Sequence, residues 1–332
     1  MTRSAPFLTS FLMILTACGT DKASTNDDSS IGHDSETGDS NVGPCTTQVM
    51  SVEPADGAAD VYYHDTITVS FDGDGGSAEF SLLDASGVDV PVTATFTEGN
   101  VQAVLTADLA PVTAYTLTTS VCGSEASSSF TTNALGSPLD MDPADLIGAT
   151  YEFRLSDADI TEPAFLDLIA GTYLTVPILI GVDSADSTSI DMLGGLGYET
   201  TDSYAQDTTL PSWDFPVADF TTQPFFHAQS PLITIMYGTT AIPIEQFNLS
   251  GTFAADGSAI EEGYVTGIGD SRYMATLVGK PADDLSAVCD LAASLGVNCT
   301  ECADGEPYCL YIVAENITAE RIDGLTLTEV LP

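Results

Sequence analysis

Apolar and polar residues alternate in short runs along most of this chain. The clearest runs cover residues 67–71, 92–96, 115–121 and 247–253. A period of two places the apolar side chains of a run on one face of an extended strand. Gly-rich or Pro-containing turns separate the runs, and Asp256-Gly257 is typical of a hairpin turn. The pattern therefore predicts a mainly β protein built from many short strands.

The composition of the 332-residue chain sets further limits. Hydrophobic residues make up 44% of it, so most of the chain can build a core. Asp and Glu number 49 against 6 Lys and Arg, which gives a formal net charge of −43. Nucleic acids and anionic lipid surfaces both require a cationic face on their partner. We therefore exclude nucleic acid as a partner, and the length predicts about two domains.

Residues 1–17 have the features of a secretory signal peptide. Arg3 supplies its positive charge, and the apolar stretch that follows is too short to span a bilayer as a helix. The stretch ends in LTACG, in which the cysteine is Cys18. This ending resembles the lipobox of bacterial lipoproteins, which implies that Cys18 carries lipid and begins the mature chain. Gly19 in place of Asp favours an anchor in the outer membrane, on its periplasmic or cell-surface face.

Residues 18–44 follow as the lipidated cysteine and an acidic tether. The segment consists largely of Ser, Thr, Asp and Gly. Such a composition cannot bury enough apolar surface to order itself, so we expect a flexible linker between lipid and protein.

Residues 45–134 show seven strand-like runs at regular spacing, the pattern of a β-sandwich. Three motifs in this region are PADG from Pro54, LAPVTAYTL from Leu109 and FTT from Phe130. Together they resemble the bacterial Ig-like domain of S-layer and secreted proteins. The resemblance implies a spacer or adhesive module without chemistry of its own. It also places Tyr115 where a tyrosine corner pins such a sandwich.

A linker at 135–146 leads to a second β-rich domain, 147–332, that the pattern predicts as a barrel or a sandwich. Its strand candidates are 151–155, 173–182, 232–237, 242–253, 260–268 and 308–317. Two short helices are expected, one over 161–171 and one over 283–296. The apolar stretch 164–182 contains Asp167, Gly171 and Pro177, which favour a buried helix followed by a central strand over a membrane helix.

The seven cysteines suit an exported protein. If Cys18 carries lipid, an even number remains, as expected for disulfide bonding outside the cytosol. Cys45 and Cys122 are alone in the first domain, so we expect them to pair. The second domain contains a close cluster of four, namely Cys289, Cys299, Cys302 and Cys309. We expect two structural bridges in this cluster, with the pairing open, and keep zinc binding and redox activity as alternatives.

The C-terminal part resembles uncharacterised lipoproteins of predatory and environmental Gram-negative bacteria. The motifs that carry this resemblance are GTFxxDG from Gly251, CDLA from Cys289 and CxxCxDG from Cys299. It implies no particular activity.

No catalytic set can be assembled from the sequence. Gly269-Asp270-Ser271 is similar to the GDS block of lipolytic hydrolases, but no His follows it to act as base. The histidines are His33, His64 and His227, scattered over the tether and both domains, which does not suggest a triad or a metal cage. Paired carboxylates are uninformative among so many acidic residues. We therefore expect a protein that is not an enzyme.

Calcium is the ion that the acidic turns would suit best, although we expect no cofactor. Asp72 and Asp74 open like an EF-hand loop, but the positions that follow do not match. Asp183 and Asp186, with Asp191, form a second acidic group. All of these are explained equally well as acidic residues of hairpin turns.

These observations predict a membrane-anchored, exported lipoprotein without catalysis. In this interpretation the first domain spaces and presents the second, which contacts a protein or another component of the envelope. One alternative is a ligand-binding barrel in the C-terminal domain, whose strands would enclose an apolar interior. The other alternative is a hydrolase of a kind that its sequence does not reveal.

Overall fold

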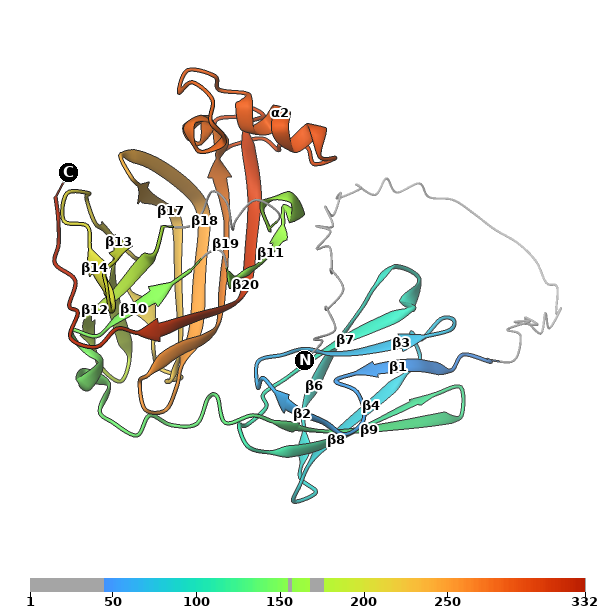
Figure 1. The fold of residues 1–332 in the computed structure, drawn as a ribbon. Helices are drawn as coiled ribbons and strands as arrows, with labels where there is room; N and C mark the ends of the chain where they lie inside the picture. The colour runs from blue at the N-terminus through green and yellow to red at the C-terminus, as the bar shows by residue number, and fades with distance from the viewer. Residues whose placement is uncertain (1–44, 155–156, 168–175, 332) are drawn as a thin grey trace, which may run out of the picture. The chain divides into compact units, whose positions relative to one another are not determined.

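The computed structural model describes residues 45–154, 157–167 and 176–331. The signal peptide and the whole tether, with Cys18 and His33, lie outside these residues. Within them the protein is mainly β, as the sequence predicts, with two sandwiched sheets followed by one large sheet (Figure 1). None of the helices in the described part is long and apolar enough to cross a membrane.

The Ig-like domain consists of a four-stranded and a five-stranded sheet. The first sheet has the order β1 (Val49–Glu53), β3 (Ile67–Phe71), β7 (Gln102–Ala107) and β6 (Val92–Phe96). The second has the order β2 (Ala58–Val61), β9 (Ser124–Thr132), β8 (Ala114–Val121), β4 (Glu79–Asp84) and β5 (Asp89–Val90). The predicted seven runs thus become nine strands, because the short β2 and β5 are too brief to show an alternating pattern.

A single core fills the space between these two sheets. Val69 and Leu105 of the first sheet and Leu82 and Leu117 of the second are at most 1% exposed and belong to one cluster. Tyr115 lies in the same cluster, and its hydroxyl oxygen accepts a hydrogen bond of 2.7 Å from the backbone N–H of Ala110. This contact pins the turn before β8 in the manner of a tyrosine corner, as the resemblance implies.

The second domain is a closed barrel. Its strands are β10 (Thr150–Phe153), β11 (Asp159–Glu162), β12 (Ile178–Ala185), β13 (Ser189–Glu199), β14 (Tyr204–Gln206), β15 (Trp213–Asp214), β16 (Ala218–Asp219), β17 (Phe225–Tyr237), β18 (Thr240–Phe253), β19 (Ala259–Asp270) and β20 (Cys309–Arg321). Pairing runs from β10 through β12, β13 and β16 to β20, and β20 pairs with β10 again. This last pairing closes a ring, so the structure favours the barrel over the sandwich.

The strands β17 to β20 form a long antiparallel meander that faces β12, β13 and β14 (Figure 1). Gln246, Glu262 and Asn316 have left-handed backbone angles, with φ of 50°, 49° and 54°. Each lies where the register between neighbouring strands shifts. Bulges of this kind bend and twist a strand, which allows such long strands to curve around a barrel.

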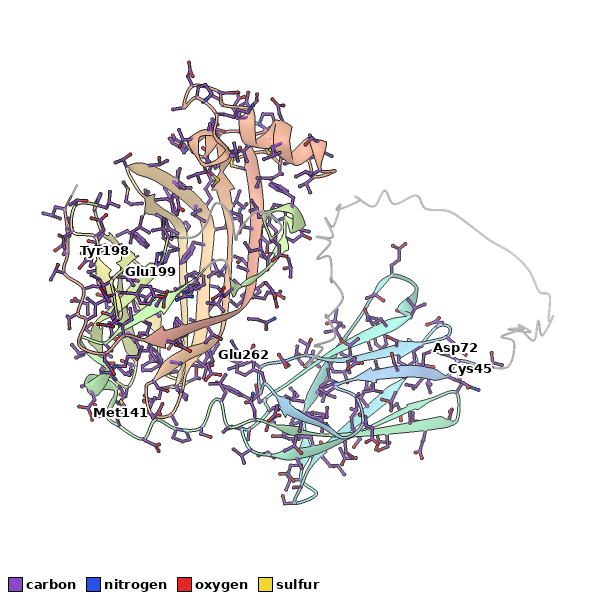
Figure 2. All side chains as sticks on the ribbon, in the orientation of Figure 1. Cys45, Asp72, Met141, Tyr198, Glu199 and Glu262 are labelled. Atoms are coloured by element: carbon purple, nitrogen blue, oxygen red, sulfur yellow. A yellow bond between two sulfur atoms is a disulfide. The ribbon has the colours of Figure 1, made fainter. Side chains whose placement is uncertain are left out.

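Strand β13 was not among the predicted strands. Its Gly-rich sequence lacks a clear alternation, yet its glycines have a packing role. A side chain at Gly194 would overlap the indole of Trp213, and one at Gly197 would meet Leu179. The strand ends in the exposed residues Tyr198 and Glu199 (Figure 2).

Both predicted helices need correction. Thr161 and Glu162 belong to β11, which pairs with β20, and helix begins only at Ala164; residues 168–171 lie outside the described residues. The second helix, α2 (Ala287–Ser294), is shorter than the predicted 283–296. It starts late because the chain after Pro281 first makes a turn, in which Asp284 N–H donates to the Pro281 carbonyl.

The remaining helical elements are short 3-10 turns. They are η1 (Glu98–Asn100), η2 (Pro143–Leu146), η4 (Ser271–Tyr273) and η5 (Ala275–Val278). The second half of the segment expected as a linker packs on the barrel core. Leu146 is fully buried there, and Leu139 and Met141 pack against the same cluster (Figure 2).

Candidate functional site

The residues considered for catalysis do not meet in the structure. Ser271 is 1% exposed, and its hydroxyl donates to the carbonyl of Tyr308 over 2.6 Å. Of the two histidines within the described residues, His64 lies in the Ig-like domain and His227 on β17 of the barrel. Burial lowers the pKa of His64, which keeps its imidazole neutral at pH 7.

The aspartates considered for calcium act in turns. Asp72 accepts from the backbone N–H of Gln48 over 2.7 Å, and Asp74 accepts from Gly76 N–H and the Asn100 amide, each over 2.9 Å. Asp186 caps the turn between β12 and β13, while Asp183 precedes it on β12. Among the described residues these four belong to no group of three or more metal-ligating atoms. Calcium binding therefore stays a prediction.

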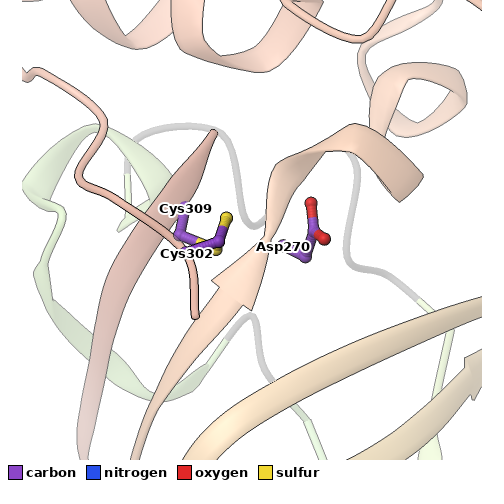
Figure 3. Close-up of side chains that lie close together, drawn as sticks. All are labelled: Asp270, Cys302 and Cys309. Atoms are coloured by element: carbon purple, nitrogen blue, oxygen red, sulfur yellow. A yellow bond between two sulfur atoms is a disulfide. The ribbon is translucent and has the colours of Figure 1, made fainter. Parts of the chain in front are cut away.

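Asp270, Cys302 and Cys309 lie close together, but they do not form a metal site (Figure 3). The two sulfur atoms are bonded to each other, so neither can act as a thiolate ligand. Asp270 is held by the guanidinium of Arg272, with Nη2 to Oδ2 at 2.6 Å and Nε to Oδ1 at 2.9 Å. Arg272 also contacts Asp304 at 2.8 Å, within the loop that the disulfide closes.

Two disulfides form in the C-terminal cysteine cluster. Cys289 of α2 is bonded to Cys299, and Cys302 is bonded to Cys309, the first residue of β20. This settles, within the structure, the pairing that the sequence leaves open and removes the four thiols needed for a zinc site. Cys45 and Cys122 are also disulfide-bonded, and their pairing with each other stays a prediction.

A small helical segment, residues 271–299, lies at the end of the barrel and contains the Cys289–Cys299 disulfide, while Cys302–Cys309 closes the loop that leads from it into β20. We call this segment the cap; it contains η4, η5 and α2 and lies at the ends of β19 and β20 (Figure 1). Val288 and Ala292 of the cap form a buried cluster with Phe165 and with Leu310 of β20. The cap is therefore held on the barrel by a small shared core and is braced internally by one disulfide.

The barrel and its cap enclose a cavity of about 230 Å³. Strands on all sides of the barrel contribute hydrophobic side chains to it, among them Phe153, Ile178, Ile235, Phe247 and Val265. The cap contributes Met274, Leu277, Val278 and Val288. The sequence suggests such a site only through its many alternating strands. Whether the side chains of all strands together fill a barrel cannot be predicted from the pattern of any one strand.

The cavity surface is apolar. Among the described residues that line it, none carries a carboxylate, imidazole, thiol, amine or guanidinium, and the hydroxyl groups of Ser250 and Tyr237 add no polar surface to it. Burial raises the pKa of Tyr237, so its phenol stays protonated. Trp213, the single tryptophan of the chain, also lines the cavity. Its Nε1 is buried against Gly194 and has no hydrogen-bond partner among the described residues.

Aromatic side chains fill the barrel end opposite the cap. Tyr151, Phe220 and Phe253 are fully buried, and the Phe253 ring centroid lies 5.5 Å from that of Tyr151 and 5.8 Å from that of Phe220. The Tyr151 hydroxyl donates to the carbonyl of Gly257 over 3.0 Å, in the turn between β18 and β19. This aromatic group packs next to Phe226, which lines the cavity at the end away from the cap.

Comparisons with known proteins assign no family. No family model matches the sequence, and no curated protein matches it. CopC from Methylosinus trichosporium OB3b is 20% identical over 26% of this chain and 94% of its own, with a TM-score of 0.24. Domains 1–6 of the surface layer protein SbsC are 11% identical over 67% of this chain and 42% of that one, with a TM-score of 0.21.

A longer structure of the same S-layer protein, rSbsC(31-844), is 10% identical over 83% of this chain and 52% of its own, with a TM-score of 0.20. The chain thus spans about half the length of these S-layer structures or less. At such low scores none of the three carries a functional conclusion, so the case for a function depends on the barrel itself.

Proposed function

We propose that this protein is an exported, non-catalytic binding protein whose C-terminal barrel holds a small apolar molecule. The observation that carries the proposal is the closed barrel with an apolar cavity of about 230 Å³. In this role the Ig-like domain acts as a spacer. The lipid on Cys18 anchors the chain in the outer membrane.

The size and chemistry of the cavity support a small ligand. Apolar cavities of ~150 Å³ stay free of water and bind molecules such as benzene. Drug-sized ligands occupy pockets of roughly 300–1,000 Å³. The cavity lies between these sizes, and the lining residues that the structure describes offer neither a nucleophile with a base nor a charged group for substrate activation. Binding of a small apolar molecule without reaction is therefore the function it supports best.

The cysteines support the export part of the proposal. Disulfides persist in oxidising compartments and are rare in the cytosol. The barrel carries two of them within 21 residues, at 289–309. Together with the signal peptide and lipobox, this pattern supports a location on the periplasmic or cell-surface side of the outer membrane, with the membrane as a partner through the lipid.

A titration of the fragment 45–332 with toluene and 1-hexanol tests this function. Trp213 lines the cavity, so its fluorescence reports occupancy, and calorimetry gives the affinity and heat-capacity change. We expect one site per chain and a negative heat-capacity change, as apolar burial requires. Absence of any saturable binding would contradict the proposal.

A cavity-filling variant makes the test specific. Ala314 lines the cavity and is 2% exposed, so Ala314→Met places a flexible side chain in the ligand volume. Loss of contact with about two methylenes at ~0.8 kcal/mol each weakens binding roughly tenfold. The matched control is Ala241→Met. Ala241 is exposed on β18, so this variant should bind the ligand with the affinity of the parent protein. Equal affinity in both variants would place the ligand elsewhere.

A further inference from the structure

We infer that the cavity takes the linear alkyl chain of an uncharged amphiphile, which enters tail-first from the cap end. This inference names the ligand class and therefore rests on the proposed function. It follows from the length of the cavity, from the difference between its two ends and from the charge of the protein.

The cavity is elongated along the barrel. On β20 its lining extends from Ile312 to Ala319, seven residues along the strand. At ~3.3 Å per residue this is a path of roughly 23 Å. We call this elongated cavity the channel. An extended hydrocarbon chain fits this shape better than a compact ring system does.

The two ends of the channel differ in chemistry. At the inner end, Phe226 lines the channel and packs on Phe253, with their ring centroids 5.5 Å apart. Phe253 belongs to the fully buried group with Tyr151 and Phe220, so a polar group placed at this end would lose its hydration without gaining a partner. The inner end therefore accepts only the methyl end of a chain.

The cap end can accommodate a polar group. Tyr237 is the last residue of β17, and its half-buried side chain lines the cavity without adding polar surface to it. The same end holds Met274, Leu277 and Val278 of the cap, and β18 reaches it at Ile242 and Ile244. A flexible Met side chain adapts to ligands of different shape. A hydroxyl or similar neutral head group can thus stay outside the apolar lining, in water beside the partly exposed Tyr237, while the chain extends inward.

Charge excludes anionic amphiphiles. No cationic side chain of the described residues lines the cavity, and the whole chain has a formal net charge of −43. A carboxylate would approach against this field and would lose hydration without an ion-pair partner. The ligand head group is therefore neutral, as in a long-chain alcohol or an ester.

A series of 1-alkanols from butanol to dodecanol tests the inference, with Trp213 fluorescence and calorimetry on the fragment 45–332. Each methylene contributes ~0.8 kcal/mol when buried, which is about a fourfold gain in affinity. We expect the fourfold steps to end within the series, at the chain length that fills the cavity. A flat series would overturn the inference.

Two further ligands test the polarity of the ends. Octanoate at pH 8 and 1,8-octanediol have the same chain length as 1-octanol. We expect both to bind at least tenfold more weakly than 1-octanol, since one brings a charge and the other a hydroxyl at the blind end. If the diol binds as tightly as 1-octanol, the inner end is not blind. If octanoate binds as tightly as 1-octanol, the charge argument is wrong.

A variant locates the inner end. Ala319 lines the cavity, is 1% exposed and lies on β20 opposite Phe153. Ala319→Leu should move the end of the fourfold steps to shorter alcohols, while Ala241→Leu on the exposed face should leave it unchanged. If the affinity series of Ala319→Leu is the same as that of the parent, the inference is overturned.

The two ligand classes separate the inference from the proposed function. If toluene binds and no alkanol does, the inferred ligand class is wrong and the proposed function stands. If neither binds, the inference and the proposed function both fail.

Discussion

Gly194 shows how one residue shapes the barrel interior. The indole of Trp213 lies directly over it, where a side chain would stand in any other residue. The indole in turn lines the cavity and is 6% exposed. Gly194 therefore weakens the alternating pattern of β13 in the sequence, but it also makes room for the Trp213 indole in the barrel wall.

Substitution of Gly194 by Ala should destabilise the barrel. The new Cβ would overlap the indole, and overpacking of this kind costs about 1–3 kcal/mol in the free energy of unfolding. Gly195→Ala is the matched control, because its nearest neighbour would be Nε2 of Gln206 at 3.6 Å, an ordinary contact. Urea unfolding measures the free energy of unfolding of both variants. Equal stability of the two variants would show that Trp213 does not pack on Gly194.

The turn between β12 and β13 gives a pH-dependent prediction at the same scale. Asp186 accepts from the hydroxyl and the N–H of Thr188, each over 2.7 Å, and these bonds hold its pKa below the ordinary 3.8. A lowered pKa means that the ionised group stabilises the turn above pH 3.8, and that this contribution is lost as pH falls through the folded value.

Thr188→Val removes the hydroxyl and should raise the pKa of Asp186 towards 3.8. Carboxyl-carbon NMR titration measures it. Thr234→Val, at an exposed position on β17, should leave the pKa unchanged. A titration curve of Asp186 that is identical in Thr188→Val and the parent would contradict this account of the turn.

At the scale of elements, ion pairs of Arg272 connect the cap to the barrel and to a disulfide-closed loop. Arg272 in η4 bonds to Asp270 at the end of β19 and to Asp304 in the loop closed by Cys302–Cys309. Asp270 is 6% exposed, so removal of Arg272 would leave a buried carboxylate without its ion-pair partner. Asp304 is about half exposed and adds little.

Arg272→Met should lower the free energy of unfolding by about 2–4 kcal/mol, because it leaves a buried carboxylate without its cation. Asp270→Asn in the same chain should recover part of the loss, since the amide needs no cation. A double-mutant cycle by urea unfolding measures the coupling. Strictly additive losses would show that the two residues do not interact.

Elements with strong alternation could be predicted from the sequence, and those without it could not. The run 247–253 predicts β18, and the Asp256-Gly257 turn predicts the hairpin to β19. In contrast, the glycines of β13 interrupt its alternating pattern, so this strand is not predicted. Gln246 adopts a left-handed conformation that is not expected for a glutamine. The cysteine pairing also depends on how the cap folds, which spacing alone does not determine.

Closure of the barrel is a property of the whole molecule and lies beyond sequence patterns. It depends on the pairing of Tyr151 with Arg321 and Phe153 with Ala319, which are far apart in the chain. The cavity depends in turn on closure and on the balance of side-chain volumes from many strands. This is why the sequence suggests a barrel as an alternative but does not identify the cavity-lining residues.

The net charge of −43 gives a prediction for the whole molecule. Like charges repel in the compact state, and salt shortens the range of the repulsion. We expect the fragment 45–332 to gain about 1 kcal/mol in stability between 50 mM and 1 M NaCl, or ~2–4 °C in Tm. Calorimetry with NaCl and KCl as paired salts measures this. A Tm that falls with both salts would contradict the expectation.

The central claim is that an apolar molecule lies inside the barrel. Isotope-filtered NOE spectra of methyl-labelled protein with unlabelled 1-octanol test it most directly. We predict NOEs from the octyl chain to the methyl groups of Ile235, Val265 and Ile312, which line the cavity. NOEs confined to the exposed Leu285 and Leu295, or none at all, would contradict the claim.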